Sequence, residues 1–372
     1  MNILILSWRG PKHPTFGGAE ISTHEHAKGW VNAGNRVVLF TSYFPNARRE
    51  EIIDGVEIKR YGKQMFGVQW EALVWYLFKS QVKFDLVIDQ FHGIPFFTPF
   101  YVRAKKLGFI HEVAKEVWHL NPWPKPYNYF PSIFGRLLEP LIFLFYRATP
   151  FMTVSESTKE DLIKWGIPSK NITVIHNGVN IPAKLKRFEK EKTPTLIFLG
   201  AISQDKGIED ALRVFSIVQK KNELSSLWVV GKAEETYLAK LKKLCIELEI
   251  ERKVIFFDYV SEIKKFELLS KAHILINTSV REGWGLVVIE AASVGTPTVG
   301  YNVPGLKDSI IQNKTGILSD ANPKSCADAI DQLLYDKKMY ESFKKNCLQR
   351  AKEFNWKDSS RISLKLIASL VG

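Results

Sequence analysis

Short runs of β-branched and other apolar residues alternate along this chain with longer segments whose apolar residues recur at helical spacing. Segments 21–33 and 71–79 carry the helical spacing. Fully buried parallel strands appear as continuous apolar runs, and strand–helix alternation favours a parallel sheet covered by helices on both faces. We therefore expect a doubly wound α/β domain. Its expected strands are 2–6, 36–41, 85–89, 109–111, 151–154 and 172–175.

The same alternation begins again at residue 195. The preceding segment, 181–194, holds five basic residues, two glutamates and no apolar periodicity, which is typical of a linker. A chain of 372 residues is also long enough for two or three domains. We predict two doubly wound, Rossmann-like α/β domains, 1–180 and 181–354, which face an interdomain cleft. The expected strands of the second are 195–199, 227–230, 254–257, 274–277 and 298–301.

Composition excludes several classes of protein. The three cysteines, Cys245, Cys326 and Cys347, are too few for a disulfide framework and their spacing suits no zinc site, so we expect a reducing compartment. No run reaches the roughly 18 apolar residues of a spanning helix. The first residues lack the basic segment of a signal peptide. These features favour a cytoplasmic protein.

The chain is basic over its whole length. It has 52 Lys and Arg against 39 Asp and Glu, a net charge of +13, with 21 basic and 15 acidic residues in the first 180. Such a charge favours anionic partners, among them nucleotide phosphates, phospholipid head groups and nucleic acid. No basic run with interleaved aromatic residues supports nucleic acid, so we expect no nucleic-acid partner.

Glycine turns follow the first expected strand of each domain. Gly17 and Gly18 open a helix, where backbone N–H groups can approach an anion; such a turn also often serves only to connect elements. The corresponding turn of the second domain carries Lys206. A lysine there is well placed to meet a phosphate as a point charge, although a loop lysine is usually just solvated.

The segment 279–297 holds the densest set of candidate site residues. Gly283 and Gly285 free the backbone at the start of an expected helix, and Glu282 and Glu290 stand eight residues apart. Carboxylates accept hydrogen bonds from vicinal sugar hydroxyls, so a glycosyl group and a ribose are suitable ligands. Alternatively, Glu282 complements the helix dipole and Glu290 is solvated. Glu290, however, lies in the apolar run LVVIEAASVG, where an unpaired charge would be costly.

The pattern Glu-x7-Glu within EGWGLVVIEAASVGTP resembles the signature of the family 4 (group 1) retaining glycosyltransferases, which have the GT-B fold. Further blocks agree with this resemblance. It implies that the first domain binds the acceptor, that the second binds a nucleotide-sugar donor, and that a last helix, 355–372, returns to the first domain. The agreeing blocks are FGGAE, FIHEVAKEVW, TVSESTKEDL, VIHNGV, DKG and the ending Phe354-Asn355-Trp356.

The resemblance also implies roles for individual residues. Glu290 would bind the ribose, Glu282 the transferred sugar and Lys206 the diphosphate, which Gly17 and Gly18 would approach from the other domain. His111 would reach the donor sugar near the reacting centre; a histidine at the end of a buried strand is otherwise often a hydrogen-bonded core residue. The remaining donor contacts implied are Ser279, Gly283, Trp284, Gly285, Leu286 and Val287, with Tyr259 and Val260 at the base.

One position departs from the family pattern, which usually has Gly-Arg where this chain has Gly200-Ala201. Either Arg281 or Arg9 replaces that cation, or turnover is weaker. The implied reaction is transfer of a hexosyl group, with retention, from a nucleotide diphospho-sugar to a hydroxyl of a glycan or lipid-linked glycan. Asp-x-Asp is absent, so we expect no metal and no cofactor. A nucleotide-binding pseudoenzyme and a nucleotide-sugar epimerase remain as alternatives.

An aromatic segment with four prolines, 121–132, favours an exposed loop over a core element. Exposed aromatic residues beside basic ones suit a membrane interface or a lipid-linked acceptor, so we expect peripheral contact with the inner face of an anionic membrane. Alternatively the aromatic residues pack in the core. The aromatic residues concerned are Trp118, Trp123, Tyr127, Tyr129, Phe130 and Phe134, and the basic ones are Lys105, Lys106, Lys115 and Lys125.

Overall fold

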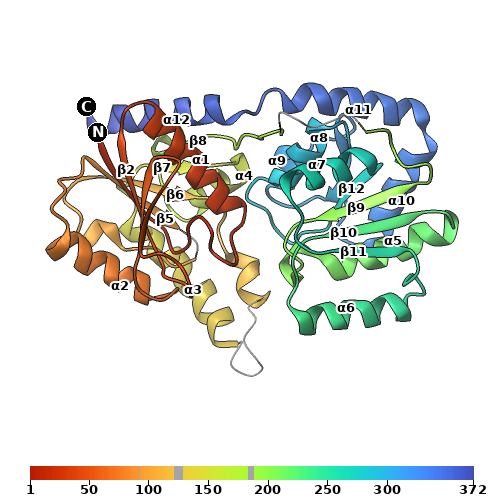
Figure 1. Ribbon diagram of the computed structural model, residues 1–372, viewed down its shortest axis with the longest axis horizontal. Coiled ribbons are helices and arrows are strands. Elements are labelled where there is room, and N and C mark those ends of the chain that lie inside the picture. Colours follow the sequence, from red (N-terminus) through yellow and green to blue (C-terminus); the bar gives the residue numbers. More distant parts are fainter. Residues whose placement is uncertain (92, 121–128, 183–187) are drawn as a thin grey trace. The chain divides into compact units, whose positions relative to one another are not determined.

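The computed structural model describes residues 1–91, 93–120, 129–182 and 188–372. The chain forms two compact units. Unit 1 comprises Met1–Gly178 and Asn355–Gly372, and unit 2 comprises Val179–Phe354 (Figure 1). The first boundary lies two residues before position 180, where the change of composition placed it, and residues 355–372 belong to unit 1.

In the described part of unit 1, an eight-stranded sheet has the order β3-β4-β2-β1-β5-β6-β7-β8. All neighbouring strands are parallel except β3 and β4, which pair antiparallel at the edge. The expectation of a wholly parallel sheet is therefore wrong at this edge. The bounds are β1 (Asn2–Leu6), β2 (Arg36–Thr41), β3 (Glu50–Ile53), β4 (Val56–Arg60), β5 (Leu86–Phe91), β6 (Lys105–Ile110), β7 (Phe151–Thr153) and β8 (Ile172–Val174).

The hairpin β3–β4 escaped the sequence analysis because an edge hairpin has no long buried run. Its turn is Asp54-Gly55, with φ of +50° and +80°. Asp-Gly between alternating apolar residues is the usual signal of a two-residue hairpin turn, so the turn chemistry could have identified it.

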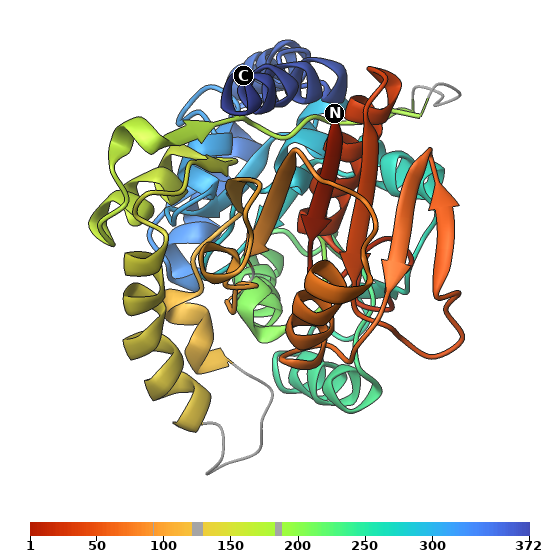
Figure 2. The ribbon, with the colours of Figure 1, turned by 90° about the vertical axis from the view of Figure 1, so that its left-hand side faces the viewer.

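Helices cover both faces of the unit 1 sheet. In Figure 1, α1 and α12 lie above the sheet and α2 and α3 below it, and Figure 2 shows the same arrangement from the side. The bounds are α1 (Gly18–Asn32), α2 (Gly67–Val74) with a π-helical turn (Trp75–Lys79), α3 (Tyr129–Phe145), α4 (Glu156–Lys164) and α12 (Trp356–Val371), with 3₁₀ turns at Thr98–Phe100, Lys115–Leu120 and Ser169–Asn171.

The contact between α1 and α12 explains why the end of the chain belongs to unit 1. Ser363 Oγ lies 2.9 Å from both Trp30 Nε1 and His26 Nδ1 in a buried cluster. Burial lowers the pKa of His26 to about 3, so this imidazole is neutral. Gly29 allows the helices to approach closely, because a Cβ there would lie 2.3 Å from Ser360 Cβ.

In the described part of unit 2, a six-stranded sheet has the order β11-β10-β9-β12-β13-β14, with parallel neighbours throughout. Its strands are β9 (Thr195–Leu199), β10 (Ser226–Val230), β11 (Val254–Phe257), β12 (Ile274–Asn277), β13 (Thr298–Tyr301) and β14 (Gly316–Ser319).

The helices described in unit 2 follow these strands along the chain. They are α5 (Ile208–Lys221), α6 (Glu235–Glu247), α7 (Glu262–Lys271), α8 (Leu286–Ser293), α9 (Leu306–Ser309), α10 (Pro323–Tyr335) and α11 (Lys337–Ala351).

The end of the expected linker is attached to unit 2. Lys190 Nζ donates to Ala272 O and to Thr296 Oγ1, both at 2.6 Å, and Glu191 N donates to Lys271 O at 3.0 Å. Residues 188–191 are therefore held by hydrogen bonds to unit 2. The composition gave no sign of this, because the bonds depend on tertiary neighbours.

Lys190 makes the stability of unit 2 depend on pH. Burial lowers its pKa from the usual 10.5 to about 7, and the nearby Lys344 ammonium adds to the shift. Above pH 7 the unfolded chain retains a proton that the folded chain loses, so this group raises the free energy of unfolding as pH rises. In Lys190→Met that contribution disappears. Between pH 7 and 9 the wild type should gain about 2 kcal/mol relative to Lys190→Met, measured by urea unfolding.

The matched control for this measurement is Lys192→Met, since Lys192 is exposed two residues along the same segment. Its free energy of unfolding should follow that of the wild type at each pH. Parallel pH curves for the wild type and Lys190→Met would contradict the assignment of a lowered pKa to Lys190.

Candidate active site

In unit 2, three loops meet at the carboxyl edge of the adjacent strands β9, β12 and β13. Two hydrogen bonds join the first two loops: Val280 N donates to Asp205 O at 2.9 Å, and Thr278 Oγ1 donates to Gly207 O at 2.7 Å. Ligands of doubly wound folds bind at this edge of the sheet, where loops and helix N-termini gather. The local hydrogen bonds therefore build one site from segments about 70 residues apart in the sequence.

Two glycines allow the loops to approach closely enough. Gly207 has φ +70°, and a Cβ on it would lie 1.9 Å from Thr278 O. Gly305, after β13, has φ +83°, and a Cβ there would lie 2.0 Å from Glu282 O. Any side chain at either position would push the loops apart. Glu282 N also donates to Pro304 O at 3.1 Å, so the loop after β13 contacts both the N–H and the carbonyl of Glu282.

An ion pair occupies this edge. Lys206 Nζ lies 3.0 Å from Glu282 Oε1, and Ser279 Oγ donates to the same oxygen at 2.8 Å. The side chains of Lys206 and Glu282 are 25% and 15% exposed, so solvent reaches both. The structure thus brings together three residues that the sequence assigned to one site. An arriving diphosphate would compete with the carboxylate for the Lys206 ammonium.

The helix α8 begins beside this ion pair. Its N-cap, Gly285, has φ +74°, and Leu286 and Val287 form the first turn with half-buried side chains. The first backbone N–H groups of a helix have no intrahelical acceptors, so they favour a bound anion. Trp284, by contrast, is buried and its ring packs edge-on against Phe354 at 5.2 Å. The Trp284 side chain is therefore part of the core of unit 2.

Glu290 has a partner that the sequence did not reveal. Lys265 of α7 donates to Glu290 Oε1 at 2.7 Å, and the two side chains are 12% and 14% exposed. Burial raises the pKa of Glu290, whereas Lys265 opposes that shift. Although burial lowers the pKa of Lys265, Glu290 and Glu262 raise it overall. Lys265 therefore compensates the charge inside the apolar run and leaves Glu290 Oε2 able to accept further hydrogen bonds.

The two residues expected near the base follow β11. Tyr259 is 79% exposed, and its backbone N–H donates to Asp258 Oδ1 at 2.7 Å. Val260 packs against an apolar cluster of unit 2. The ring of Tyr259 therefore faces solvent, whereas Val260 is partly buried against the core of unit 2.

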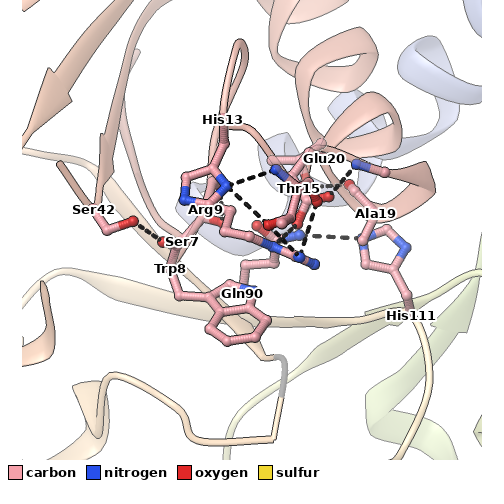
Figure 3. A network of polar contacts seen from close by, with 12 residues as sticks. Ser7, Trp8, Arg9, His13, Thr15, Ala19, Glu20, Ser42, Gln90 and His111 are labelled. Atoms are coloured by element: carbon pink, nitrogen blue, oxygen red, sulfur yellow. Dashed lines mark hydrogen bonds and ion pairs between the residues drawn. The ribbon is translucent and has the colours of Figure 1, made fainter. Parts of the chain in front are cut away.

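In unit 1, the loop after β1 contains a compact polar network. Arg9 Nε donates to Glu20 Oε1 at 2.9 Å, and Arg9 NH1 donates to Thr15 O at 3.0 Å. Figure 3 shows these side chains turned toward one another, with His13 Nδ1 accepting from Thr15 N. Burial, Arg9 and Arg60 lower the pKa of His13 to about 4, so its ring is neutral near pH 7.

The glycine pair at the start of α1 includes one backbone amide that is hydrogen-bonded within unit 1. Gly17 N donates to Glu20 Oε2 at 2.8 Å, so the amide that was expected to meet an anion already has a carboxylate acceptor. Gly17 has φ −147°, an extended conformation open to any residue. Gly18 is the first residue of α1. The backbone conformation at position 17 therefore does not require a glycine.

His111 follows β6 at the carboxyl edge of the unit 1 sheet and is 6% exposed. Its Nε2 lies 3.3 Å from Gln90 Nε2, and its carbonyl accepts from Thr158 Oγ1 at 3.0 Å (Figure 3). These contacts fit a hydrogen-bonded histidine in the wall of the unit. Its place at the strand end also suits a ligand contact, so both interpretations from the sequence stand.

The two arginines considered as replacements for the cation missing at Ala201 are both held inside their own units. Arg9 belongs to unit 1 and pairs with Glu20. Arg281 belongs to unit 2 and is 5% exposed. Ala201 itself is exposed.

Two family models match the chain over adjoining segments. The model of "Glycosyl transferases group 1" matches residues 181–350, and that of "Glycosyltransferase Family 4" matches residues 16–182. The chain belongs to this glycosyltransferase family. The two matches meet where the structure divides the chain, at the boundary between unit 1 and unit 2.

Relatives of known sequence are glycosyltransferases as well. An uncharacterized glycosyltransferase of Methanocaldococcus jannaschii is 25% identical over 90% of each chain. The O-antigen chain mannosyltransferase RfbU of Salmonella typhimurium is 26% identical over 70% of each chain.

Solved structures show the same fold. Sucrose-phosphate synthase of Thermosynechococcus elongatus superposes with a TM-score of 0.82 at 17% identity, over 99% of this chain and 98% of that one. The Anabaena protein HepE, in complex with UDP-glucose, gives a TM-score of 0.74 at 16% identity, over 99% and 100%. Each unit has a mainly parallel sheet covered by helices, and two such α/β units constitute the GT-B fold, as the sequence predicted.

Gly305→Ala tests the close approach that holds Glu282 in place. The variant introduces both a strained φ and a Cβ contact of 2.0 Å with backbone, so we expect unfolding to become easier by more than about 3 kcal/mol. Gly34→Ala is the matched control, because Gly34 has φ +84° with nothing within 4 Å of a Cβ. It should lose only about 1 kcal/mol. If thermal unfolding gave the same loss of stability for Gly305→Ala and Gly34→Ala, the close contact between Gly305 and Glu282 O would not limit which residue position 305 accepts.

Proposed function

We propose that this glycosyltransferase moves a hexosyl group from a nucleotide diphospho-sugar to an acceptor hydroxyl with retention of configuration and without a metal ion. The observation that carries the proposal is the convergence of Lys206, Glu282 and Ser279 at the N-terminus of α8. A cation beside unpaired helix amides suits a diphosphate, and a nearby carboxylate suits sugar hydroxyls.

Lys206 would neutralise the diphosphate as the bond from the sugar C1 to the phosphate oxygen breaks. The acceptor oxygen would form its bond to C1 on the same face of the sugar, and its proton would pass to the departing phosphate oxygen. Glu282, released from Lys206 by the incoming phosphate, would accept hydrogen bonds from the sugar. Glu290 would hold the ribose through Oε2, the carboxylate oxygen that does not bond Lys265.

The comparisons support the substrate classes. HepE binds UDP-glucose, and RfbU is named as an O-antigen chain mannosyltransferase. We infer a nucleotide-sugar donor and a glycan or lipid-linked glycan acceptor for this chain. The described residues contain no helix long and apolar enough to cross a membrane. We propose that the protein works in the cytoplasm, in peripheral contact with an anionic membrane.

A pseudoenzyme that binds nucleotide but transfers no sugar is the second candidate. Ala201 favours it, because the usual arginine is missing and Arg281 is buried. Saturating donor with a range of glycan acceptors separates the two candidates: transfer of sugar supports the enzyme, and binding of the nucleotide diphosphate without any transfer supports the pseudoenzyme.

Glu290→Ala should abolish donor binding in titration calorimetry, because it removes the acceptor proposed for the ribose hydroxyls. The donor is chosen first from a panel of common nucleotide sugars by thermal shift. The variant also leaves the Lys265 ammonium without its partner, so the double variant Glu290→Ala/Lys265→Met is measured in parallel and should fail to bind as well.

Glu267→Ala is the control for this titration, since Glu267 pairs with Lys264 and Lys271 on the same helix that carries Lys265. It should bind donor like the wild type. Unchanged donor affinity in Glu290→Ala would rule out the proposed role of Glu290.

A further inference from the structure

The helix α3 exposes large apolar side chains along its outer side, from one end to the other. Nine of its residues are 48% to 67% exposed. Single exposed apolar side chains are ordinary on protein surfaces, but a contiguous set of this size marks an interaction site. The nine are Tyr129, Phe130, Ile133, Phe134, Leu137, Leu138, Leu141, Leu144 and Phe145.

Two polar residues, Ser132 and Glu139, lie on the side of α3 that faces the protein. Glu139 is buried and accepts hydrogen bonds from Ala114 N at 2.8 Å, Lys115 N at 3.0 Å and Trp118 Nε1 at 2.8 Å. Ser132 is also buried and donates to Trp118 O at 3.0 Å. The usual arrangement of a surface helix, with apolar residues inside and polar ones outside, is therefore reversed here.

Contacts at the second half of α3 fix its orientation. Phe143 is buried in the unit 1 core, where its ring lies 5.5 Å from that of Phe91. With Glu139 bonded on one side and Phe143 packed in the core, the helix cannot rotate to hide its outer side chains. The apolar surface is therefore a fixed feature of the folded unit.

The exposed surface continues beyond the helix. Phe100 is 64% exposed, and its ring lies 5.1 Å from that of Phe145. At the other end, Phe130 and Phe134 stack at 4.8 Å. We call the nine exposed residues of α3 together with Phe100 the α3 face. Aromatic rings lie at both of its ends, with Ile and Leu side chains between them.

The segment of the chain that contains α3 is mainly basic. Arg136 is the one exposed charged side chain among those of α3 that the structure describes. Residues 98–150 contain seven basic and three acidic residues, and one of the acidic residues, Glu139, is buried. Two copies of the chain that met through this face would bring like charges together. An anionic bilayer offers the opposite charge and an apolar interior.

We propose that the α3 face docks this protein on the surface of an anionic lipid bilayer, with the helix lying in the plane of the membrane. A helix of 17 residues is about 25 Å long, and its exposed side is apolar along this length. The proposal deepens the peripheral placement proposed above. It rests on the proposed function in one respect: docking would give the enzyme access to a lipid-linked acceptor. Binding of the protein to a bilayer does not itself require sugar transfer.

The proposed surface differs from the one expected from the sequence. Trp123, Tyr127 and Lys125 lie outside the described residues. Two of the expected basic residues are engaged elsewhere: Lys106 Nζ donates to Val102 O at 2.9 Å, and Lys115 pairs with Asp161. Tyr129, Phe130 and Phe134 belong to a helix and not to a loop. The apolar surface extends well past residue 134, to Phe145.

Vesicle co-sedimentation of the full chain tests the proposal. The wild type should bind vesicles of phosphatidylcholine mixed with phosphatidylglycerol more tightly than vesicles of phosphatidylcholine alone. Leu137→Asp/Leu141→Asp should weaken binding by more than about tenfold, and Arg136→Glu by about fivefold or more. Leu224→Asp, which changes a side chain 70% exposed in unit 2, is the matched control and should bind like the wild type.

Three outcomes would overturn the proposal. The wild type fails to bind anionic vesicles; the double variant binds them as well as the wild type while its thermal unfolding is unchanged; or the wild type is a dimer that the double variant dissociates, without vesicle binding. Donor titration with the same variants keeps the two proposals apart. Lost vesicle binding with intact donor affinity supports the α3 face, whereas vesicle binding without donor affinity contradicts only the transferase proposal.

Discussion

The candidate donor site depends on how closely three loops approach one another at the carboxyl edge of β9, β12 and β13. Gly207 and Gly305 have positive φ angles and leave no room for a Cβ against Thr278 O and Glu282 O. This contact brings Lys206 within 3.0 Å of Glu282, although 76 residues separate them in the sequence. The parallel sheet supplies the common edge, and the glycines make the edge compact enough to hold a site.

Charge compensation is the second constraint on unit 2. Glu290 lies in an apolar helix, and Lys265 from the neighbouring helix balances it at 2.7 Å. Glu282 is balanced by Lys206 in the same way. Each carboxylate therefore has a cationic partner before any ligand arrives. In the proposed mechanism a diphosphate takes over Lys206, while Lys265 stays paired with Glu290 and opposes the rise that burial causes in its pKa.

The sequence predicted the strands that are buried on both faces, because these appear as continuous apolar runs. It missed β3 and β4 at the sheet edge, where the pattern is short and half polar, and it missed β14. It grouped Lys206, Ser279, Glu282 and Glu290 through a family resemblance, but it gave no sign of Lys265, whose contact with Glu290 arises only when α7 packs on α8. The reversed polarity of α3 was likewise hidden. An apolar helix sequence does not say which of its faces is turned inward, and the polar stripe becomes visible only through the bonds of Glu139.

Hydrogen–deuterium exchange of the full chain, with and without a saturating nucleotide sugar chosen by thermal shift, tests the central claim most directly. That claim is that the edge of β9, β12 and β13 binds the donor. Binding there should slow exchange of the backbone amides in residues 203–207 and 283–290, because the diphosphate would accept hydrogen bonds from the loop and from the first turn of α8. Saturated binding that leaves these two segments unprotected, with slower exchange only elsewhere in the chain, would contradict the account.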